Sequence, residues 1–314
     1  MKLKIFVTRL VPQEGIDIIK DKYDVDVWDS EDVIPYEALR EKVVGITALF
    51  CTISDNIDAG ILDAAGPSLK VVATMSVGKH HINLEECKQR GIQVTNTPDV
   101  ASDSAAELTV ALLLLTTRRL LEGFEAVKNG EWGKWKPMWI LGTESLNRTL
   151  GIMGMGRVGF GVARRLKPFG VSKIIYHDVT QAAFADDVGA ELVSFEELLK
   201  ESDLLCVCCA LTPQTRHIFD KSAFSKMKSS AVLINTSRAA LLQQSDLYEA
   251  LKEGQISAAG LDVTDPEPLP VNHPLLSLPN CVILPHLGTN TTDARSNMSI
   301  NTAMNIRAVL EPLE

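Results

Sequence analysis

Residues 154–159 form a glycine-rich segment, GMGRVG, between a strand-like apolar run at 149–153 and a helix-like run. Val162, Leu166 and Phe169 follow at helical spacing, so a helix begins within the segment and packs one face on a sheet. Glycines often form simple turns. A strand, a G-x-G-x-x-G loop and a helix in this order, however, are typical of a dinucleotide site, because the helix N-terminus offers N–H groups to a pyrophosphate. The sequence therefore predicts dinucleotide-binding residues at Gly154, Gly156, Arg157, Val158 and Gly159.

The residue that follows the next expected strand bears on the choice of nucleotide. Asp178 follows the apolar run 173–176 and lies about 20 residues beyond the glycines, where an acid can accept hydrogen bonds from the adenosine ribose. A carboxylate at this position repels a 2′-phosphate, and no Lys or Arg follows before Lys200. We therefore expect NAD(H) as the cofactor, with NADP(H) as the alternative if basic residues come from elsewhere in the chain.

Strand-like and helix-like runs alternate along nearly the whole chain, which predicts α/β architecture with parallel sheets and right-handed crossovers. The first series of expected strands is 4–9, 25–28, 46–51, 71–76 and 92–96. The second series is 150–153, 174–176, 204–209, 232–235, 258–262 and 282–284. Because the glycine loop opens only the second series, we expect two separate sheets, with the nucleotide domain as an insert or a C-terminal domain.

Two long helical stretches complete this organisation. Residues 102–129 are expected to form one helix that is closed by Gly130 as its C-cap. Residues 291–310 are also expected to be helical and could return to the first domain. The expected domains are thus 1–100 with 288–314, and 101–287.

Composition and charge exclude several classes of function. The 314 residues are 46% hydrophobic and 23% charged, which is ordinary for a globular protein of two domains. The net charge of −9 argues against a general nucleic-acid or anionic-membrane surface. The longest apolar run, 110–115, is too short to span a bilayer. We therefore expect a small-molecule substrate, with neither nucleic acid nor membrane as a partner.

Six cysteines bear on metal binding and on the redox environment. Cys206, Cys208 and Cys209 lie in an expected buried strand, where alternate side chains point to opposite faces and do not easily converge on one ion. We interpret them as small buried hydrophobic side chains and expect no metal site. Reduced thiols and a strand-like start, which does not read as a secretory signal, predict a cytosolic protein.

Three residues at the ends of late strands suit the chemistry of 2-oxo and 2-hydroxy acids. Arg238 follows the strand at 232–235, and its planar fork can hold a carboxylate. His286 follows the strand at 282–284 and can exchange a proton near neutral pH. Glu267 lies beyond the strand between them, and a carboxylate beside a histidine favours the imidazolium and fixes its orientation. Ligands in open α/β sheets bind at the carboxyl ends of the strands, so all three suit one site.

A set of short motifs supports this interpretation. They are Ser76-Val77-Gly78, Asn96-Thr97-Pro98, the glycine loop, Leu211-Thr212-Pro213-x-Thr215, Asn235-x-Ser237-Arg238, Gly260-Leu261-Asp262-Val263, Glu267-Pro268 and Pro285-His286-x-Gly288. With these motifs the chain resembles the D-isomer-specific 2-hydroxyacid dehydrogenases over essentially its whole length, and within them the glyoxylate reductase/hydroxypyruvate reductase branch. The resemblance implies two Rossmann-like domains: a flavodoxin-like substrate domain built from both chain ends, and a doubly wound NAD(P)-binding domain. It also implies reduction of hydroxypyruvate and glyoxylate to D-glycerate and glycolate.

The resemblance further implies a role for each matching residue. His286 is the general acid in reduction and Glu267 pairs with it, while Arg238 binds the substrate carboxylate and carbonyl. The backbone of Val77 and Gly78 holds the other side of the carboxylate. Asp262 contacts the nicotinamide carboxamide, and the remaining implied cofactor contacts are Thr212, Pro213, Thr236 and Gly288.

The segment WGKWKPMW at 132–139 is an aromatic arm of the kind found in this branch. In relatives it belongs to the dimer region, and Trp135 matches a residue that reaches the neighbouring subunit's site. Large aromatic side chains so close together also favour an interface on physical grounds, although a plain hydrophobic patch is the alternative. We therefore expect a homodimer with Trp135 at the substrate site.

The chain departs from the pattern of its relatives at two places. Relatives usually carry an acid just beyond the glycine of the Ser-Val-Gly loop, where this chain has Lys79 and His80. We expect these residues to add positive charge and to widen tolerance for acidic substrates. Relatives usually have glycine where Ala239 stands, and alanine there would narrow the site or weaken cofactor binding. Two alternative functions remain open: another D-2-hydroxyacid dehydrogenase, or a non-catalytic NAD-sensing paralogue.

Overall fold

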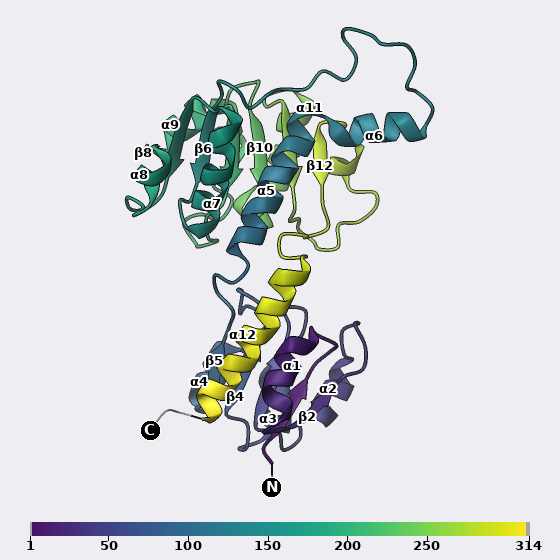
Figure 1. Ribbon diagram of the computed structural model, residues 1–314, viewed down its shortest axis with the longest axis vertical. Helices are drawn as coiled ribbons and strands as arrows, with labels where there is room; N and C mark the ends of the chain where they lie inside the picture. Colours follow the sequence, from purple (N-terminus) through teal and green to yellow (C-terminus); the bar gives the residue numbers. More distant parts are fainter. Residues whose placement is uncertain (1, 312–314) are drawn as a thin grey trace. The chain divides into compact units, whose positions relative to one another are not determined.

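The computed structural model describes residues 2–311, which divide into two compact units (Figure 1). Unit 1 combines the chain up to residue 101 with the segment from residue 290 onward. Unit 2 is continuous and spans residues 102–289. Each unit is an α/β assembly around one parallel sheet, as the alternating sequence pattern predicts.

Unit 1 has a five-stranded sheet in the order β2-β1-β3-β4-β5, in which every neighbouring pair is parallel. The strands are β1 (Lys4–Val7), β2 (Asp24–Val27), β3 (Ala48–Cys51), β4 (Val71–Thr74) and β5 (Gln93–Thr95). This order is that of flavodoxin-like folds, which confirms the fold expected for this part of the chain.

Helices cover both faces of the unit 1 sheet because successive strand residues point to opposite sides. In β1, Phe6 joins a core cluster with α2 (Tyr36–Lys42), α3 (Ala59–Ala65) and α4 (Leu84–Gln89). Ile5 joins a second cluster on the other face, which is covered by two helices. These are α1 (Gln13–Lys20) and α12 (Thr292–Leu310). The first and last helices of the described chain therefore complete the same core.

Unit 2 has a seven-stranded parallel sheet in the order β12-β11-β10-β9-β6-β7-β8. Its strands are β6 (Thr149–Met153), β7 (Lys173–His177), β8 (Ala190–Leu192), β9 (Leu204–Val207), β10 (Val232–Asn235), β11 (Ala258–Leu261) and β12 (Cys281–Ile283). The chain winds outward from β6 in one direction and from β9 in the other, so the order reverses between these two strands. This is the doubly wound arrangement, and ligands bind at such a reversal.

Two helical layers cover the unit 2 sheet. One layer contains α5 (Ser102–Thr117), α7 (Arg157–Leu166) and α8 (Ala185–Val188). The other contains α9 (Phe195–Glu201), α10 (Lys221–Lys226) and α11 (Gln244–Lys252). Short 3-10 helices occur at η1 (Lys167–Phe169), η2 (Ala239–Leu241) and η3 (Pro274–Ser277). The central strands β6, β9, β10 and β11 are almost fully buried between the two layers.

The expected single helix over 102–129 is wrong, because the chain turns after α5 and resumes as α6 (Leu120–Lys128). Arg119 adopts a left-handed backbone with φ of 54°, which no α-helix can accommodate. The carbonyl of Thr117 instead accepts a hydrogen bond from the N–H of Thr143, at 2.8 Å. The expected glycine at the end is confirmed, since Gly130 follows α6 with φ of +73°.

The segment from α6 to residue 148 leaves the body of unit 2 (Figure 1). No helix or strand lies between Lys128 and Thr149. Within residues 2–311, no helix is long and apolar enough to cross a membrane.

Candidate active site

The glycine loop sits at the point where the unit 2 sheet reverses its order, directly after β6. Gly154 has φ of +93°, and a Cβ placed there would lie 2.6 Å from Cα of Cys209. A Cβ on Gly159 would lie 2.2 Å from the carbonyl oxygen of Gly154. Both positions therefore require glycine, because any side chain would collide with backbone.

The first turn of α7 is open to an anionic ligand. Gly156 is the N-cap residue of this helix, and no side chain caps the turn that begins at Arg157 and Val158. A Cβ on Gly156 would meet nothing within 4 Å, so space exists beside the N-terminus. Uncapped N–H groups and a positive dipole end suit the pyrophosphate of a dinucleotide. The residues present thus fit the expected cofactor.

Asp178 follows β7 and its carboxylate lies against the glycine loop. One carboxylate oxygen accepts from the N–H of Met155 at 2.9 Å. The other accepts from the N–H of Val179 at 2.7 Å. This arrangement keeps a negative charge beside the loop, where an adenosine ribose would lie in a nucleotide complex.

The other expected cofactor contacts lie after neighbouring strands. Thr236 follows β10, and its hydroxyl is 2.6 Å from that of Thr109 in α5. Thr212 and Pro213 lie in an exposed turn that follows β9, where the N–H of Thr212 donates to the hydroxyl of Thr215 at 2.8 Å. These residues thus share the carboxyl edge of the sheet with the glycine loop.

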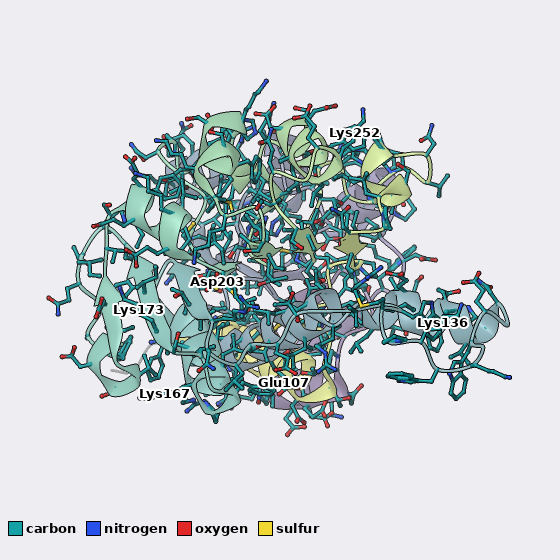
Figure 2. All side chains as sticks on the ribbon, turned by 90° about the horizontal axis from the view of Figure 1, so that it is seen from above. Glu107, Lys136, Lys167, Lys173, Asp203 and Lys252 are labelled. Carbon is teal, nitrogen blue, oxygen red and sulfur yellow. The ribbon has the colours of Figure 1, made fainter. Side chains whose placement is uncertain are left out.

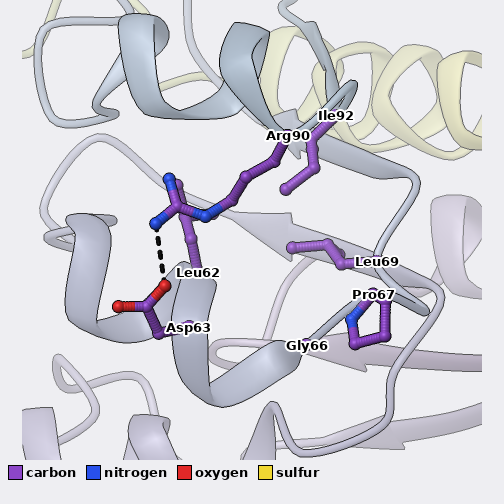
Figure 3. Close-up of a pocket in the computed structure, with 7 residues that line it drawn as sticks. All are labelled: Leu62, Asp63, Gly66, Pro67, Leu69, Arg90 and Ile92. Carbon is purple, nitrogen blue, oxygen red and sulfur yellow. Dashed lines mark hydrogen bonds and ion pairs between the residues drawn. The ribbon is translucent and has the colours of Figure 1, made fainter.

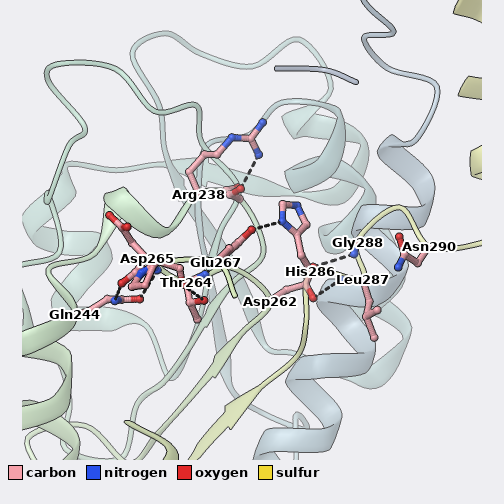
Figure 4. Close-up of polar contacts among 12 residues, drawn as sticks. Arg238, Gln244, Asp262, Thr264, Asp265, Glu267, His286, Leu287, Gly288 and Asn290 are labelled. Atoms are coloured by element: carbon pink, nitrogen blue, oxygen red, sulfur yellow. Dashed lines mark hydrogen bonds and ion pairs between the residues drawn. The ribbon is translucent and has the colours of Figure 1, made fainter. Parts of the chain in front are cut away.

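His286 and Glu267 form the central contact of the site (Figure 4). Nδ1 of His286 lies 2.8 Å from Oε2 of Glu267, and the two side chains are 45% and 39% exposed. Figure 4 shows the carboxylate of Glu267 pointing at the ring of His286. Because Nδ1 faces the carboxylate, Nε2 is the ring nitrogen left for a substrate.

Glu267 is held in place by the turn that carries it. Its second oxygen accepts from the N–H of Thr264 at 3.0 Å. Gln244 at the start of α11 grips the same turn, because its amide donates to the carbonyl of Asp265 at 2.5 Å and accepts from the N–H of Asp265 at 3.0 Å. Sequence reasoning missed Gln244, and nothing in the sequence marks a helix-terminal glutamine as part of this site.

Asp262 fixes the backbone immediately after His286. Its fully buried carboxylate accepts from the N–H of Leu287 at 2.7 Å and from the N–H of Gly288 at 2.8 Å. Burial raises the pKa of Asp262, while these two backbone donors act in the opposite direction. His286 itself has a left-handed backbone with φ of 57°, a conformation that needs support from its surroundings. By binding the N–H groups of the next two residues, Asp262 holds the backbone on the C-terminal side of His286 in place.

Arg238 lies just beyond the end of β10, which pairs with the strand that leads to Glu267, and Figure 4 shows it near His286. Its guanidinium donates to the carbonyl of Ser237 at 2.7 Å. The buried Asn235 organises the turn, because its amide donates to the carbonyl of Arg238 at 2.9 Å and accepts from the N–H of Ser237 at 3.1 Å. Ala239 begins a 3-10 helix and lacks a positive φ, so its backbone does not require glycine, and its expected effect on cofactor binding stays a prediction.

The Val77–Gly78 loop follows β4 in unit 1 and has an unusual distribution of backbone hydrogen bonds. The carbonyl of Ser76 accepts from the N–H of Thr97 at 3.0 Å. The carbonyl of Val77 accepts from the side chain of Asn96 at 2.8 Å, and that of Gly78 accepts from the hydroxyl of Ser76 at 2.6 Å.

The N–H groups of these three peptide units belong to Val77, Gly78 and Lys79. No acceptor within residues 2–311 receives any of the three. In a trans peptide the N–H points away from the carbonyl, so pinning the carbonyls also fixes the directions of the N–H groups. Unpaired backbone N–H groups can donate to a bound anion. We call the N–H groups of residues 77–79 the anion nest.

Trp135 lies on the exposed segment that follows α6 and makes no contact with the glycine loop or His286 that the structure records. Its surface is 85% exposed, and those of Trp132 and Met138 are 71% and 78% exposed. Figure 2 shows Lys136 on this segment, away from the body of unit 2. An apolar surface of this kind on a projecting segment is typical of an interaction site.

A hollow of about 320 Å³ in unit 1 lies beside α3 and α4 (Figure 3). Arg90 reaches over it and pairs with Asp63 at 2.7 Å and with Glu86. The guanidinium is thus already neutralised, and no expected site residue lines this hollow.

Cys206 is buried in β9, but the strand ends at Val207, so Cys208 and Cys209 lie beyond it and are partly buried. The expectation that all three cysteines lie in one buried strand is therefore wrong. Burial raises the pKa of the Cys206 thiol to about 12 and that of Cys209 to about 11. Thiols with raised pKa are poor nucleophiles and poor metal ligands at neutral pH. Within the described part of the chain, no three His, Cys, Asp or Glu side chains are grouped to hold a metal ion.

The fold and the site together define a class: an α/β enzyme with a dinucleotide loop at the switch point of its sheet and a histidine–carboxylate pair at the same edge. Comparisons with known proteins identify the family. The family model described as D-isomer specific 2-hydroxyacid dehydrogenase, NAD binding domain, matches residues 110–288. The chain belongs to this family and is an NAD(P)-dependent D-2-hydroxyacid dehydrogenase, as its motifs predict.

Relatives of known name cover nearly the whole chain. It is 51% identical to the glyoxylate reductase/hydroxypyruvate reductase of Homo sapiens, over 99% of this chain and 96% of the human protein. It is 41% identical to the glyoxylate reductase of Thermococcus kodakarensis, over 98% of this chain and 93% of that protein.

Solved structures agree with this assignment. A crystal structure of a protein from Thermus thermophilus matches with a TM-score of 0.93 and 40% identity, covering 99% of this chain and 98% of that one. The NADPH-dependent glyoxylate/hydroxypyruvate reductase of Sinorhizobium meliloti, in complex with NADP and malonate, matches with a TM-score of 0.82 and 29% identity, covering 99% and 95%.

Proposed function

We propose that this enzyme reduces hydroxypyruvate to D-glycerate and glyoxylate to glycolate. The observation that carries the proposal is the contact between Nδ1 of His286 and Glu267, which leaves one ring nitrogen to deliver a proton at the carboxyl edge of a nucleotide-binding sheet. The names of the relatives support the choice of these two keto acids.

The proposed roles follow from the chemistry of each group. The nicotinamide cofactor, when bound, supplies a hydride to the keto carbon. His286 gives the proton on Nε2 to the keto oxygen, so the carbonyl gains one hydride and one proton, and Glu267 stabilises the imidazolium before the transfer. Arg238 holds the substrate carboxylate and polarises the carbonyl. The N–H groups of Val77 and Gly78 also donate to the substrate carboxylate.

The residues of unit 2 place the cofactor under this proposal. The glycine loop and the first turn of α7 hold the pyrophosphate through residues 156–159, and Asp178 binds the adenosine ribose. Thr212, Pro213, Thr236 and Gly288 line the same edge of the sheet. Asp262 contacts the carboxamide of the nicotinamide while its oxygens secure the backbone at residues 287 and 288.

The test is the oxidation of NADH or NADPH by the purified protein with hydroxypyruvate, glyoxylate, pyruvate and oxaloacetate in parallel. We expect the highest kcat/KM with hydroxypyruvate or glyoxylate. A clear preference for another 2-oxo acid would assign a different dehydrogenase of the same family. Tight nucleotide binding without turnover of any of the four acids would favour a nucleotide-sensing protein instead.

We further propose that NAD(H) is preferred over NADP(H). The support is the carboxylate of Asp178 beside the glycine loop, since it would repel a 2′-phosphate. The relative from Sinorhizobium meliloti is NADPH-dependent, so the preference needs its own test. We expect a lower Kd for NADH than for NADPH, and a reversal or loss of this difference in Asp178→Ser. Equal affinities in the unaltered protein would contradict the proposal.

We also propose a homodimer in which the aromatic arm, residues 132–139, carries Trp135 to the partner's substrate site. The exposure of Trp132, Trp135 and Met138 supports this, because several large apolar side chains exposed on one short segment are typical of an interaction site. Light scattering should give twice the chain mass. Mixing His286→Gln with Trp135→Ala chains should restore part of the activity, because one site of a mixed dimer would contain both native residues. No recovery after verified subunit exchange would show that Trp135 serves its own subunit.

Two smaller proposals complete this picture. The cysteines of the described chain are free, which supports a reducing compartment such as the cytosol, and fractionation of the source cells tests this location. The positive charge of Lys79 broadens tolerance for acidic keto acids. Lys79→Ile should therefore lower kcat/KM for oxaloacetate more than for glyoxylate. An equal decrease for the two substrates would contradict the proposal.

A further inference from the structure

Beneath the anion nest lies a chain of buried polar side chains that the proposed reaction does not use. Nε2 of His81 lies 3.0 Å from the hydroxyl oxygen of Thr74. That hydroxyl lies 2.9 Å from the hydroxyl of Ser76, which in turn donates to the carbonyl of Gly78 at 2.6 Å. Thr74 and Ser76 are almost completely buried. The chain thus connects a histidine to the last carbonyl of the nest.

The direction of every hydrogen bond in this chain is determined, because each hydroxyl has only one proton. The hydroxyl of Ser76 donates its one proton to the carbonyl of Gly78, which can only accept. Ser76 must then accept from Thr74, and Thr74 must accept from His81. His81 therefore carries its proton on Nε2, while Nδ1 is bare.

The surroundings of His81 hold it in this state. Its Nδ1 is buried and has no partner among the described residues, so a second proton there would be left without an acceptor. Burial, followed by the nearby His80, lowers the pKa of His81 to about 4, and Asp55 only partly opposes this. The backbone on both sides is also fixed. The N–H of Ile57 donates to the carbonyl of His81 at 2.9 Å, and the N–H of Asn83 donates to the carbonyl of Ile57 at 2.9 Å.

We propose that His81, Thr74 and Ser76 are positioning residues, which orient the anion nest at residues 77–79 through a one-way relay of hydrogen bonds that starts at Nε2–H of His81. The relay fixes the peptide between Gly78 and Lys79, just as Asn96 fixes the one before it. None of the three relay side chains is proposed to contact the substrate. The inference rests on the proposed role of the nest in holding the substrate carboxylate.

The test compares two isosteric substitutions of buried threonines in unit 1. Thr74→Val removes the middle of the relay, while Thr302→Val removes a buried hydroxyl bond to the carbonyl of Met298 in α12, far along the chain from the nest. Both should lower stability. Only Thr74→Val should raise KM for hydroxypyruvate and the inhibition constant of oxamate, an unreactive carboxylate analogue, by about 5- to 20-fold, with kcat within about 3-fold. Thr74→Ser should restore both values, and the Kd for NADH should not change.

A second measurement does not depend on turnover. Nitrogen NMR of the labelled protein at neutral pH should show a protonated Nε2 and a bare Nδ1 for His81, assigned by the loss of the signals in His81→Gln. A bare Nε2 would overturn the relay, as would an unchanged KM and oxamate inhibition constant in folded Thr74→Val. If the native protein turns over no keto acid, the proposed function fails, while the NMR result still decides whether the relay exists.

Discussion

Each unit presents a histidine at the carboxyl edge of its sheet, and the two histidines have opposite surroundings. His286 in unit 2 faces the carboxylate of Glu267 and keeps 45% of its side chain exposed. His81 in unit 1 faces the hydroxyl of Thr74 and buries its other nitrogen without a partner among the described residues. A charged, exposed partner lets a histidine exchange protons, whereas a buried hydroxyl partner holds it in one tautomer. The same side chain therefore suits proton transfer at one edge and scaffolding at the other.

The largest expected effect comes from replacing the exposed histidine. His286→Gln should lower kcat by about 10²- to 10⁴-fold, because the substituted amide cannot give up a proton as the imidazolium does. The matched variant His81→Gln should mainly raise KM. Steady-state kinetics of both variants with hydroxypyruvate measure the contrast. If kcat falls as severely in His81→Gln as in His286→Gln, the proposed difference between the two histidines is contradicted.

Removing the carboxylate of the exposed pair should have the next largest effect. Glu267→Gln keeps the shape of the side chain but no longer supplies a negative charge to the imidazolium, and we expect kcat/KM to fall by about 10²-fold. Glu196→Gln is the control, since it removes an exposed carboxylate that pairs with Lys200. Equal kcat/KM values for Glu267→Gln and the control would show that the charge of Glu267 does not contribute to the reaction.

The buried histidine should lower the free energy of unfolding at low pH. Its pKa of about 4 lies below the value of 6.5 that it has when unfolded, so the unfolded chain takes up a proton first as the pH falls. Stability should therefore decline between pH 6.5 and 4, by about 1–2 kcal/mol after allowance for partial exposure. Urea unfolding of the native protein and of His81→Gln at pH 7 and 4.5 measures the difference. His80→Gln, which removes an adjacent charge, should reduce the decline only in part, and identical declines in the native protein and His81→Gln would exclude His81 as its source.

The smallest effect is expected at Ala239, beside Arg238. Because Ala239 lies in a 3-10 turn without a positive φ, Ala239→Gly relieves no backbone strain. We expect the Kd for NADH to change by less than about 2-fold. Fluorescence titration measures it, and a marked gain in affinity would show that the methyl group crowds the cofactor.

Much of the fold follows from local sequence patterns. Buried strands such as β4 and β9 are short apolar runs, and the glycine loop lies in its proper place after β6. The short strand β8, with the sequence AEL, escaped prediction because three residues carry no period. The break at Arg119 also escaped it, since a left-handed residue is favoured there by contacts with a segment more than 20 residues further on, including the bond to the carbonyl of Leu141.

The site was only partly predictable for a similar reason. Arg238, Glu267 and His286 stand at strand ends, where motif and chemistry coincide, and the structure brings Glu267 to His286. The grip of Gln244 on Asp265 depends on where a helix begins relative to a distant turn. The His81 relay depends on side chains of one strand end meeting the loop that follows it. Hydrogen bonds of this kind depend on the three-dimensional positions of atoms and cannot be inferred from the sequence.

The division of unit 1 between two stretches of chain has a consequence for synthesis. Gly15 in α1 lies so close to Ser299 in α12 that a Cβ would fall 2.2 Å from its hydroxyl oxygen, and α12 covers one face of the first sheet. A ribosome must translate all of unit 2, roughly 190 residues, before α12 exists, which takes about 10–40 s at ordinary rates. During that interval α1 is the only helix of the described chain available to cover this face of the first sheet. Unit 1 can therefore complete its core only after the whole of unit 2 has been translated.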